Sequence, residues 1–296
     1  MKWEGQRESD NVDDVRDSSG GGGGFGGIVG GRGLSLGGVV IALILSWVLG
    51  INPLTMLGLM QGGQGGGQAP VSQQAPANPG HAAQDPGLRF VKTVLASTED
   101  VWTAYFSQRG QQYTAPRLEV FRGQYPTGCG TGQAAAGPFY CPADRKVYID
   151  LSFYDVLRDR LGAPGEFAQA YVVAHEVGHH LQNLMGISEK LDRARGQVSA
   201  AQYNALSVRL ELQADCYAGV WASHARQQFQ LEQADIDSAL NAASQIGDDT
   251  LQRKARGTVV PESFTHGTSA QRVRWFKQGL QSGELNSCDT FGATDL

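Results

Sequence analysis

Residues 170–182 contain His-Glu-x-x-His within a segment whose residues favour a helix. A helix turns about 100° per residue, so His175 and His179 differ by about 40° and share one face. Two imidazoles in this relation can hold one Zn²⁺ ion from a single rigid element. Glu176 lies roughly 80° from that direction, where it could take a proton from water that the metal activates. His180 points about 120° away and is not an expected ligand.

A chance match to His-Glu-x-x-His on an ordinary helix should occur in about one chain of this length in a hundred. A second helical stretch, residues 207–219, favours a metal site instead. Glu211 and Asp215 are again four residues apart and share a face. A catalytic zinc needs three protein ligands and an open position, and a carboxylate completes a His₂Glu set. We therefore expect Glu211 to be the third ligand. Asp215 would accept the free ring N–H of a ligand histidine and fix its tautomer.

The alternative for Glu211 is an ordinary solvated carboxylate on a helix surface, which is the common situation for glutamate. Its apolar neighbours favour a largely buried helix instead, and an unpaired buried carboxylate is costly. These neighbours are Leu210, Leu212, Ala214, Ala218 and Trp221.

Four segments resemble the bacterial family of putative neutral zinc metallopeptidases. They are residues 175–180, 211–219, 137–142 and 288–291, and the resemblance extends to the short polar head and the hydrophobic segment near residue 45. It implies a gluzincin-like zincin fold, one bound Zn²⁺ and hydrolysis of peptide bonds in a peptide or protein substrate, as in a zinc metalloendopeptidase.

The resemblance to zincins also suggests roles for two further segments. The strand expected at residues 146–151 could be the sheet edge on which substrate lies extended, or an ordinary structural strand. His266 precedes a helix whose N-cap is expected at Thr268 or Ser269. Related zincins use a late-loop His or Arg to stabilise the oxyanion, so His266 could do the same or have no role. His224 is expected to be a structural histidine.

Composition and charge define the remaining organisation. The 296 residues allow an anchor and one domain of roughly 200 residues, and the net charge of −5 offers no basic patch for nucleic acid. We expect a flexible cytoplasmic tail at 1–33, a transmembrane helix at 34–52, a disordered linker rich in Gly, Gln and Pro at 53–87, and the metallopeptidase domain at 88–296.

Residues 34–51 form an uncharged apolar run of eighteen residues, just long enough to cross a membrane. A cleaved signal peptide and a buried core helix are the alternatives. The 33-residue head is long for a signal peptide, and glycine and glutamine tracts leave a core helix nothing to pack on. Lys2, Arg7, Arg16 and Arg32 precede the run, whereas the next basic residue is Arg89. The positive-inside rule thus predicts a single-pass protein of the bacterial cell membrane with its domain on the extracytoplasmic side.

The four cysteines suit two disulfides in an oxidising compartment. Three pairings are possible; we favour Cys129 with Cys141, which leaves Cys216 with Cys288. A second metal site would be expected to contain a C-x-x-C pair, which the sequence lacks, and free buried thiols would be expected in a cytoplasmic domain.

Hydrophobic periodicity predicts a domain that is mainly α with a small β-sheet, an α+β fold. Strands are expected at 118–121 and 146–151, and helices at 90–109, 153–161, 166–185, 199–228, 231–246 and 269–281.

The sequence thus predicts a membrane-anchored zinc metallopeptidase with Glu176 as general base. The alternative is a non-catalytic, membrane-anchored binding or scaffold protein that contains zinc only for structure. A closed structural zinc site has no need for Glu176 beside the metal.

Overall fold

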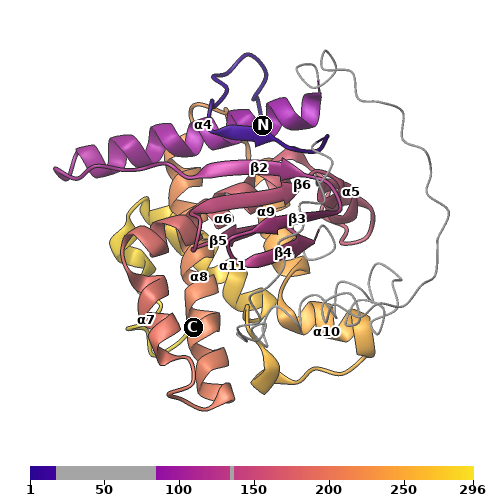
Figure 1. Cartoon of the computed structure of the whole chain (residues 1–296), viewed down its shortest axis with the longest axis vertical. Coiled ribbons are helices and arrows are strands. Elements are labelled where there is room, and N and C mark those ends of the chain that lie inside the picture. The colour runs from indigo at the N-terminus through magenta and orange to yellow at the C-terminus, as the bar shows by residue number, and fades with distance from the viewer. Residues whose placement is uncertain (18–84, 134–136) are drawn as a thin grey trace, which may run out of the picture.

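The structure is a computed structural model that describes residues 1–17, 85–133 and 137–296 (Figure 1). The predicted membrane helix at 34–52 lies outside these residues, as do most of the predicted linker and the second half of the predicted tail. Within the described ranges, no helix is both long and apolar enough to cross a membrane. This part of the chain is mainly helical with a small sheet, as the sequence predicts.

The main sheet has four strands in the order β1–β2–β6–β5. Strands β1 (Val12–Asp14), β2 (Arg117–Phe121) and β6 (Lys146–Asp150) run parallel, and β5 (Phe139–Cys141) pairs antiparallel with β6. An antiparallel hairpin consists of β3 (Gln124–Thr127) and β4 (Gly130–Gln133). Both predicted strands are present as β2 and β6. However, β6 lies between two partners, so the expectation that it forms an edge is wrong, and the edge beside it is β5.

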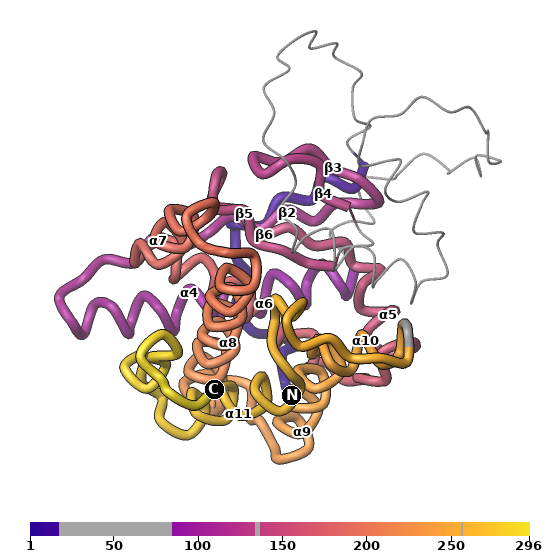
Figure 2. The backbone as a smooth tube through the Cα atoms, turned by 90° about the horizontal axis from the view of Figure 1, so that it is seen from below, coloured from indigo at the N-terminus to yellow at the C-terminus, as the bar shows by residue number. Residues whose placement is uncertain are grey.

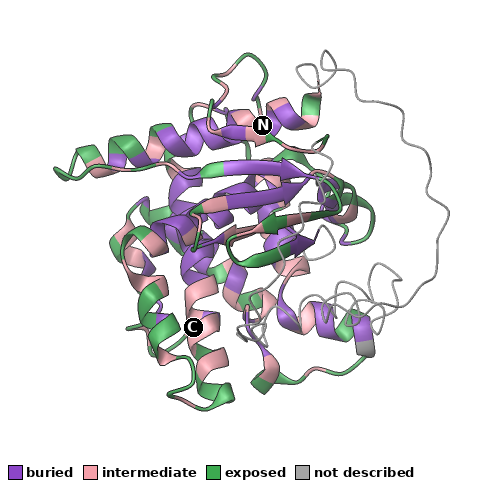
Figure 3. Cartoon of the chain, in the orientation of Figure 1, coloured by how far each residue is buried: buried purple, intermediate pink, exposed green. Residues whose placement is uncertain are grey.

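The described helices cover all six predicted ones, with ends that differ by a few residues. Helices α7 and α10 were not predicted, because they are short and polar. The helices are α4 (Pro86–Ser107), α5 (Ser152–Asp159), α6 (Glu166–Leu184), α7 (Ile187–Ala194), α8 (Ala200–Ala225), α9 (Gln233–Gln245), α10 (Asp248–Arg256) and α11 (Ser269–Ser282). Figure 3 shows burial concentrated in the sheet and the central helices, whereas α7 and the first half of α8 are mostly exposed or half-buried.

Successive side chains of β2 and β6 point to opposite faces of the sheet, and both faces are buried. Leu118 and Ile149 belong to the large core formed with the helices. Phe121 and Tyr148 point to the other face, where they join a small cluster with Tyr125 of the hairpin. Figure 2 shows the hairpin on one side of the sheet and helices α6 and α8 on the other.

Two glycines allow three helices to pack at very short distances. A Cβ atom at Gly178 in α6 would lie 3.0 Å from the carbonyl oxygen of Ala214 in α8. A Cβ atom at Gly279 in α11 would overlap the carbonyl oxygen of Cys216, also in α8. Side chains from α6, α8 and α11 therefore meet across these contacts.

The structure contains the two favoured disulfides. Cys129 pairs with Cys141 and Cys216 with Cys288, with Cα–Cα distances of 5.7 and 5.6 Å. The first links the β3–β4 hairpin to the edge strand β5. The second links α8 to the short 3₁₀ helix at Leu285–Cys288 near the C-terminus.

The first part of the head, residues 1–17, packs onto the domain and is not the predicted flexible tail. Val12 pairs with Leu118 in the parallel register of β1 and β2. Trp3 is only 8% exposed, and its indole N–H donates to Glu166 at 2.8 Å. The head contains few apolar residues, and the partner of its strand lies more than 100 residues further along the chain, which explains why local patterns miss this pairing.

The docked head also constrains the membrane topology. Arg16 and Asp85, which stand near the two ends of the intervening segment, form an ion pair at 2.5 Å. A single crossing by residues 34–52 would place the head and the domain on opposite sides of the bilayer, where β1 could not pair with β2. The pairing of β1 with β2 and the predicted single-pass topology, with a cytoplasmic head and an exported domain, therefore make opposite predictions for the side on which the head lies.

Candidate metal centre

Helix α6 presents the two predicted histidine ligands on one face. The Nε2 atoms of His175 and His179 lie 3.2 Å apart. The opposite side of this helix is buried in the core through residues such as Val173 and Val177. The four-residue spacing and the apolar face together direct both imidazoles toward α8.

Helix α8 places Glu211 opposite the two histidines. Its carboxylate oxygens lie 3.2 Å from His175 Nε2 and 3.6 Å from His179 Nε2. Ligands bound tetrahedrally to one zinc at about 2.0–2.1 Å lie about 3.3 Å apart. The separations of the three ligand atoms, all within 4.8 Å of one another, therefore fit a single ion. Two imidazoles and one carboxylate are also the donor set of a catalytic zinc.

The charge distribution within this cluster favours a cation. Burial alone would raise the pKa of Glu211, but His266, His179 and His175 hold that pKa well below its usual value. Burial alone would lower the pKa of His175, but Asp215 and Glu211 raise it to about 10. A metal bound here would displace protons from the cluster, so its affinity would fall as pH falls.

Glu176 is buried beside the cluster, with 7% of its surface exposed. Burial raises the pKa of its carboxyl group above the usual value. No residue in the described part of the chain forms a hydrogen bond with this carboxylate. An unpaired carboxylate is costly in such a place, so the arrangement suits a group whose partner comes from outside the chain, such as water or substrate.

Asp215 holds His175 as the sequence predicts. The Nδ1–H of His175 donates to Asp215 at 2.9 Å, and Asp215 is fully buried. Burial would raise the pKa of Asp215, but Arg272 and His175 lower it to about 2. The ionised carboxylate only accepts, so Nδ1 carries a proton, and a metal that displaced the second proton would find the lone pair on Nε2, facing the cluster.

Sequence reasoning missed the two other residues that hold Asp215. The Arg272 guanidinium donates to both carboxylate oxygens at 2.8 and 2.9 Å, and the Tyr171 hydroxyl donates at 2.5 Å. Arg272 comes from α11, which reaches this position through its contact with α8 at Gly279. The only local signal for Arg272 is its position one turn before Trp275 and Phe276, on the buried face of an amphipathic helix.

His266 reaches the same site from the loop before α11, whose N-cap is Thr268 as expected. Its Nε2 lies 3.9 Å from Glu211. Its Nδ1 lies 2.9 Å from the Thr265 hydroxyl and 3.6 Å from Asp248. Burial alone would lower the pKa of His266, but Glu211 and Asp248 raise it above the usual value.

Asp248, which sequence reasoning missed, fixes the loop that carries His266. One of its carboxylate oxygens accepts from the backbone N–H groups of Thr265, His266 and Gly267 at 2.7, 2.7 and 3.2 Å. Burial would raise the pKa of Asp248, but His266 and these N–H groups lower it. The sequence feature that could have pointed to Asp248 is a pair of acidic residues after Gly247, at the start of a short helix.

Two other histidines lie outside the centre, as the sequence predicts. His180 makes hydrogen-bond contacts with the Thr114 carbonyl oxygen at 2.7 Å and with the Tyr140 hydroxyl at 3.0 Å. His224 lies 2.9 Å from the carbonyl oxygen of Gly283. Neither belongs to the group of possible metal ligands found among the described residues.

Comparison with known proteins agrees with this geometry. The sequence profile of a family described as putative neutral zinc metallopeptidase matches residues 1–291. The chain belongs to this family. The matched region includes the docked head as well as both helices that carry the predicted ligands.

Similar proteins occur in distant bacteria. "Uncharacterized protein YpfJ" of Escherichia coli (strain K12) is 50% identical over 296 residues, which is 99% of each chain. "Uncharacterized protein Rv2575" of Mycobacterium tuberculosis (strain ATCC 25618 / H37Rv) is 44% identical over 219 residues, 70% of this chain and 73% of the relative. No solved structure matches the chain significantly.

Proposed function

We propose that this member of the zinc metallopeptidase family is a zinc-dependent endopeptidase that hydrolyses peptide bonds. The convergence of His175, His179 and Glu211 beside the unpartnered carboxylate of Glu176 carries the proposal. A zinc site used only for structure would require the first three residues but not the fourth. This arrangement therefore favours catalysis over the alternative of a non-catalytic binding or scaffold protein.

The chemistry follows from the positions of the side chains. A zinc ion held by His175, His179 and Glu211 would lower the pKa of water toward neutrality and polarise the substrate carbonyl. Glu176 takes the proton of the attacking water and delivers it to the leaving amine. Asp215 keeps His175 in the tautomer that offers Nε2 to the ion.

His266 is suited to stabilise the oxyanion that develops on the carbonyl. Its Nε2 lies 3.9 Å from Glu211, and Glu211 and Asp248 raise its pKa above the usual value despite its burial, which favours the protonated ring. Asp248 holds the loop in place before substrate binds, so little reorganisation is needed during the reaction.

An extended peptide would add to the edge strand β5, not to β6. In the described sheet β5 pairs only with β6, and Tyr140 of β5 contacts His180 and Asn183 of the ligand helix α6. Backbone hydrogen bonds along such an edge give affinity without strong side-chain selectivity.

The two disulfides favour an oxidising compartment for the folded domain. We accordingly place the domain outside the cytoplasm. The docked head lies on the same side.

Metal analysis and a peptide-library cleavage assay on the purified full chain test the proposal together. One zinc per chain is expected, and the variants His179→Ala and Glu211→Ala should lose it. His224→Ala serves as the matched control, because the contacts described for His224, with the Gly283 carbonyl oxygen and the Tyr105 ring, include no proposed ligand. Full zinc occupancy in both ligand variants would reject the ligand set. Zinc binding by the wild-type chain without cleavage of any library peptide would favour the non-catalytic alternative.

A further inference from the structure

The second ligand histidine, His179, has a buried partner that neither the motif nor the family resemblance indicates. Its Nδ1 lies 2.8 Å from Oε1 of Gln182, one turn further along α6. Gln182 is fully buried. A buried amide must satisfy both its oxygen and its two N–H groups, so its other contacts determine its orientation.

The two N–H groups of Gln182 fix the direction of its amide. They donate to the carbonyl oxygen of Leu210 at 2.7 Å and to Oε1 of Gln213 at 3.1 Å. The Leu210 carbonyl can only accept, so the amide nitrogen must face α8 and the oxygen must face His179. Leu210 directly precedes Glu211. The Gln182 amide therefore links the ring of one proposed ligand, His179, to the backbone next to another, Glu211.

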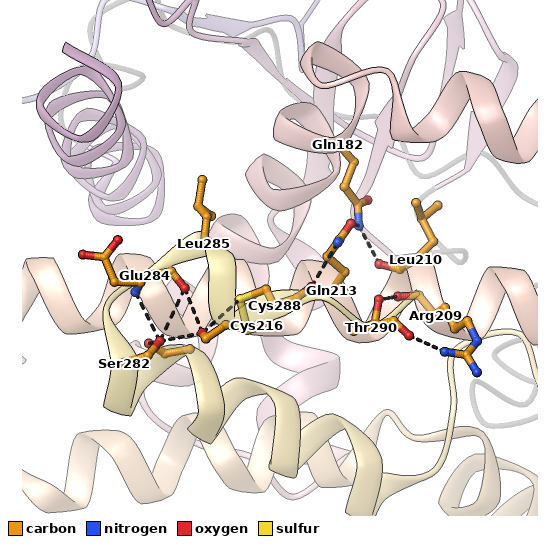
Figure 4. The surroundings of a disulfide bond; sticks show 12 residues. Gln182, Arg209, Leu210, Gln213, Cys216, Ser282, Glu284, Leu285, Cys288 and Thr290 are labelled. Carbon is orange, nitrogen blue, oxygen red and sulfur yellow. Dashed lines mark hydrogen bonds between the residues drawn. A yellow bond between two sulfur atoms is a disulfide. The ribbon is translucent and has the colours of Figure 1, made fainter. Parts of the chain in front are cut away.

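Gln213 extends this chain of hydrogen bonds to the C-terminal disulfide, as Figure 4 shows. Its side chain is 5% exposed, and its Nε2 donates to the carbonyl oxygen of Cys288 at 3.0 Å. Cys288 is in turn bonded to Cys216 of α8. A second backbone carbonyl therefore fixes the direction of Gln213, and its amide oxygen is left to receive the N–H of Gln182.

The chain of amides sets the tautomer of His179. Oε1 of Gln182 can only accept, so Nδ1 of His179 carries the proton. The lone pair of Nε2 is then directed at His175 and Glu211, whose ligand atoms lie 3.2 and 3.6 Å away. Both histidines thus present Nε2 to the same point, one held by the carboxylate of Asp215 and the other by a neutral amide.

We infer that Gln182 is a positioning residue of the metal centre. Gln213, which is hydrogen-bonded to the disulfide-linked Cys288, holds Gln182 in its orientation. The inference rests on the proposed zinc site and extends it. Gln182 fixes the tautomer and ring orientation of His179 and ties that ring to the backbone next to Glu211. Partners of this kind change metal affinity by about 10- to 100-fold when they are removed.

The decisive variant is Gln182→Met, which keeps the length of the side chain and removes all three hydrogen bonds. Zinc affinity of the full chain is measured by competition with a chelator. We expect the dissociation constant to rise about 10- to 100-fold. Gln213→Met should give a smaller rise, because Leu210 still orients Gln182. Gln252→Met is the matched control: Gln252 of α10 is fully buried, and its amide is hydrogen-bonded to Val260 and Ser263 in the segment after α10 and to no proposed ligand.

A merely structural role for Gln182 predicts a different result. In that case, Gln182→Met and Gln252→Met would both lower the melting temperature of the metal-free protein but leave zinc affinity unchanged. That outcome would overturn the inference while leaving the zinc site itself intact. Failure of the wild-type chain to bind zinc would instead contradict the proposed function.

A measurement on the wild-type protein covers the case in which Gln182→Met fails to fold. Histidine labelled with ¹⁵N reports which ring nitrogen of His179 carries the proton in the zinc-loaded chain. We expect a proton on Nδ1 that exchanges slowly with water. A proton on Nε2, with the metal on Nδ1, would overturn the inference.

Discussion

Gly178 of α6 lies against Ala214 of α8, where a Cβ atom at position 178 would approach the Ala214 carbonyl oxygen to 3.0 Å and its Cα atom to 3.1 Å. Gly178 stands between the two ligand histidines, and Ala214 stands between Glu211 and Asp215. The glycine inside the motif therefore determines how closely the two halves of the metal site approach each other.

Gly178→Ala should accordingly weaken zinc binding as well as the fold. The added methyl group forces the two helices apart by a few tenths of an ångström. Overpacking of this kind costs roughly 1–3 kcal/mol, partly offset by about 1 kcal/mol of better helix propensity. Thermal unfolding and chelator competition measure the two effects. A variant with wild-type melting temperature and zinc affinity would show that this contact does not set the ligand geometry.

Glu176→Gln should keep zinc and fold but lose hydrolysis. The substitution preserves size and helix propensity while it removes the group that accepts the proton. Zinc content, melting temperature and turnover of a cleaved library peptide are compared with those of the wild-type chain. Near-normal turnover in this variant would mean that another group acts as the base.

His266→Ala should lower kcat by about 100- to 1,000-fold, the usual effect of removing one oxyanion donor, while zinc content stays complete. Asp248→Asn should have a smaller effect in the same direction, because the asparagine holds the loop less firmly. Equal losses of zinc and activity in His266→Ala would assign this histidine to the metal and not to the oxyanion.

The sequence could predict those parts of the site that lie within single helices. The four-residue spacings of His175 with His179 and of Glu211 with Asp215 require only helix geometry. Arg272, Asp248 and Gln213 contribute through contacts between separate helices and loops, and no local pattern specifies these. Gln182 is within helical reach of His179, but its role depends on Leu210 in another helix.

The same distinction between local patterns and contacts of distant segments explains the errors in the predicted fold. Val147 and Ile149 alternate with polar positions, which predicts a strand but not its place in the sheet. The position of β6 between β2 and β5 depends on pairings with distant segments. The strand at Val12–Asp14 is too short to recognise without its partner at Leu118–Val120.

The Cys216–Cys288 disulfide should stabilise both the fold and the metal site. Its cysteines are 72 residues apart, and closing such a loop contributes roughly 4 kcal/mol in the chain-entropy model. Replacing both cysteines with alanine should lower the melting temperature and weaken zinc binding, because α8 carries Glu211 and Cys288 anchors Gln213.

The double replacement of Cys129 and Cys141 is the matched control for that experiment. This pair braces the hairpin and β5, so its loss should lower the melting temperature and leave zinc affinity nearly unchanged. Four alkylatable thiols in freshly isolated wild-type protein would contradict both disulfides and the proposed oxidising compartment.

Truncation of one side chain in the head should destabilise the whole domain. Trp3 packs edge-on against Phe90 of α4, with ring centroids 5.4 Å apart, and donates to Glu166 at the start of α6. Trp3→Ala should cost roughly 3 kcal/mol, as for other buried aromatic residues. Lys2→Ala, at an exposed neighbouring position, is the control. If the head were flexible, Trp3→Ala and Lys2→Ala would be equally stable.

The docked head also predicts that residues 1–17 and the rest of the described domain share one compartment. Single cysteines placed at exposed positions, Glu4→Cys in the head and Glu189→Cys in α7, can be probed in intact cells with a membrane-impermeant maleimide. Because β1 is a strand of the same sheet as β2, we expect the two positions to react alike before and after the membrane is made permeable. Labelling of Glu189→Cys but not Glu4→Cys in intact cells would support the single-pass topology and contradict the pairing of β1 with β2.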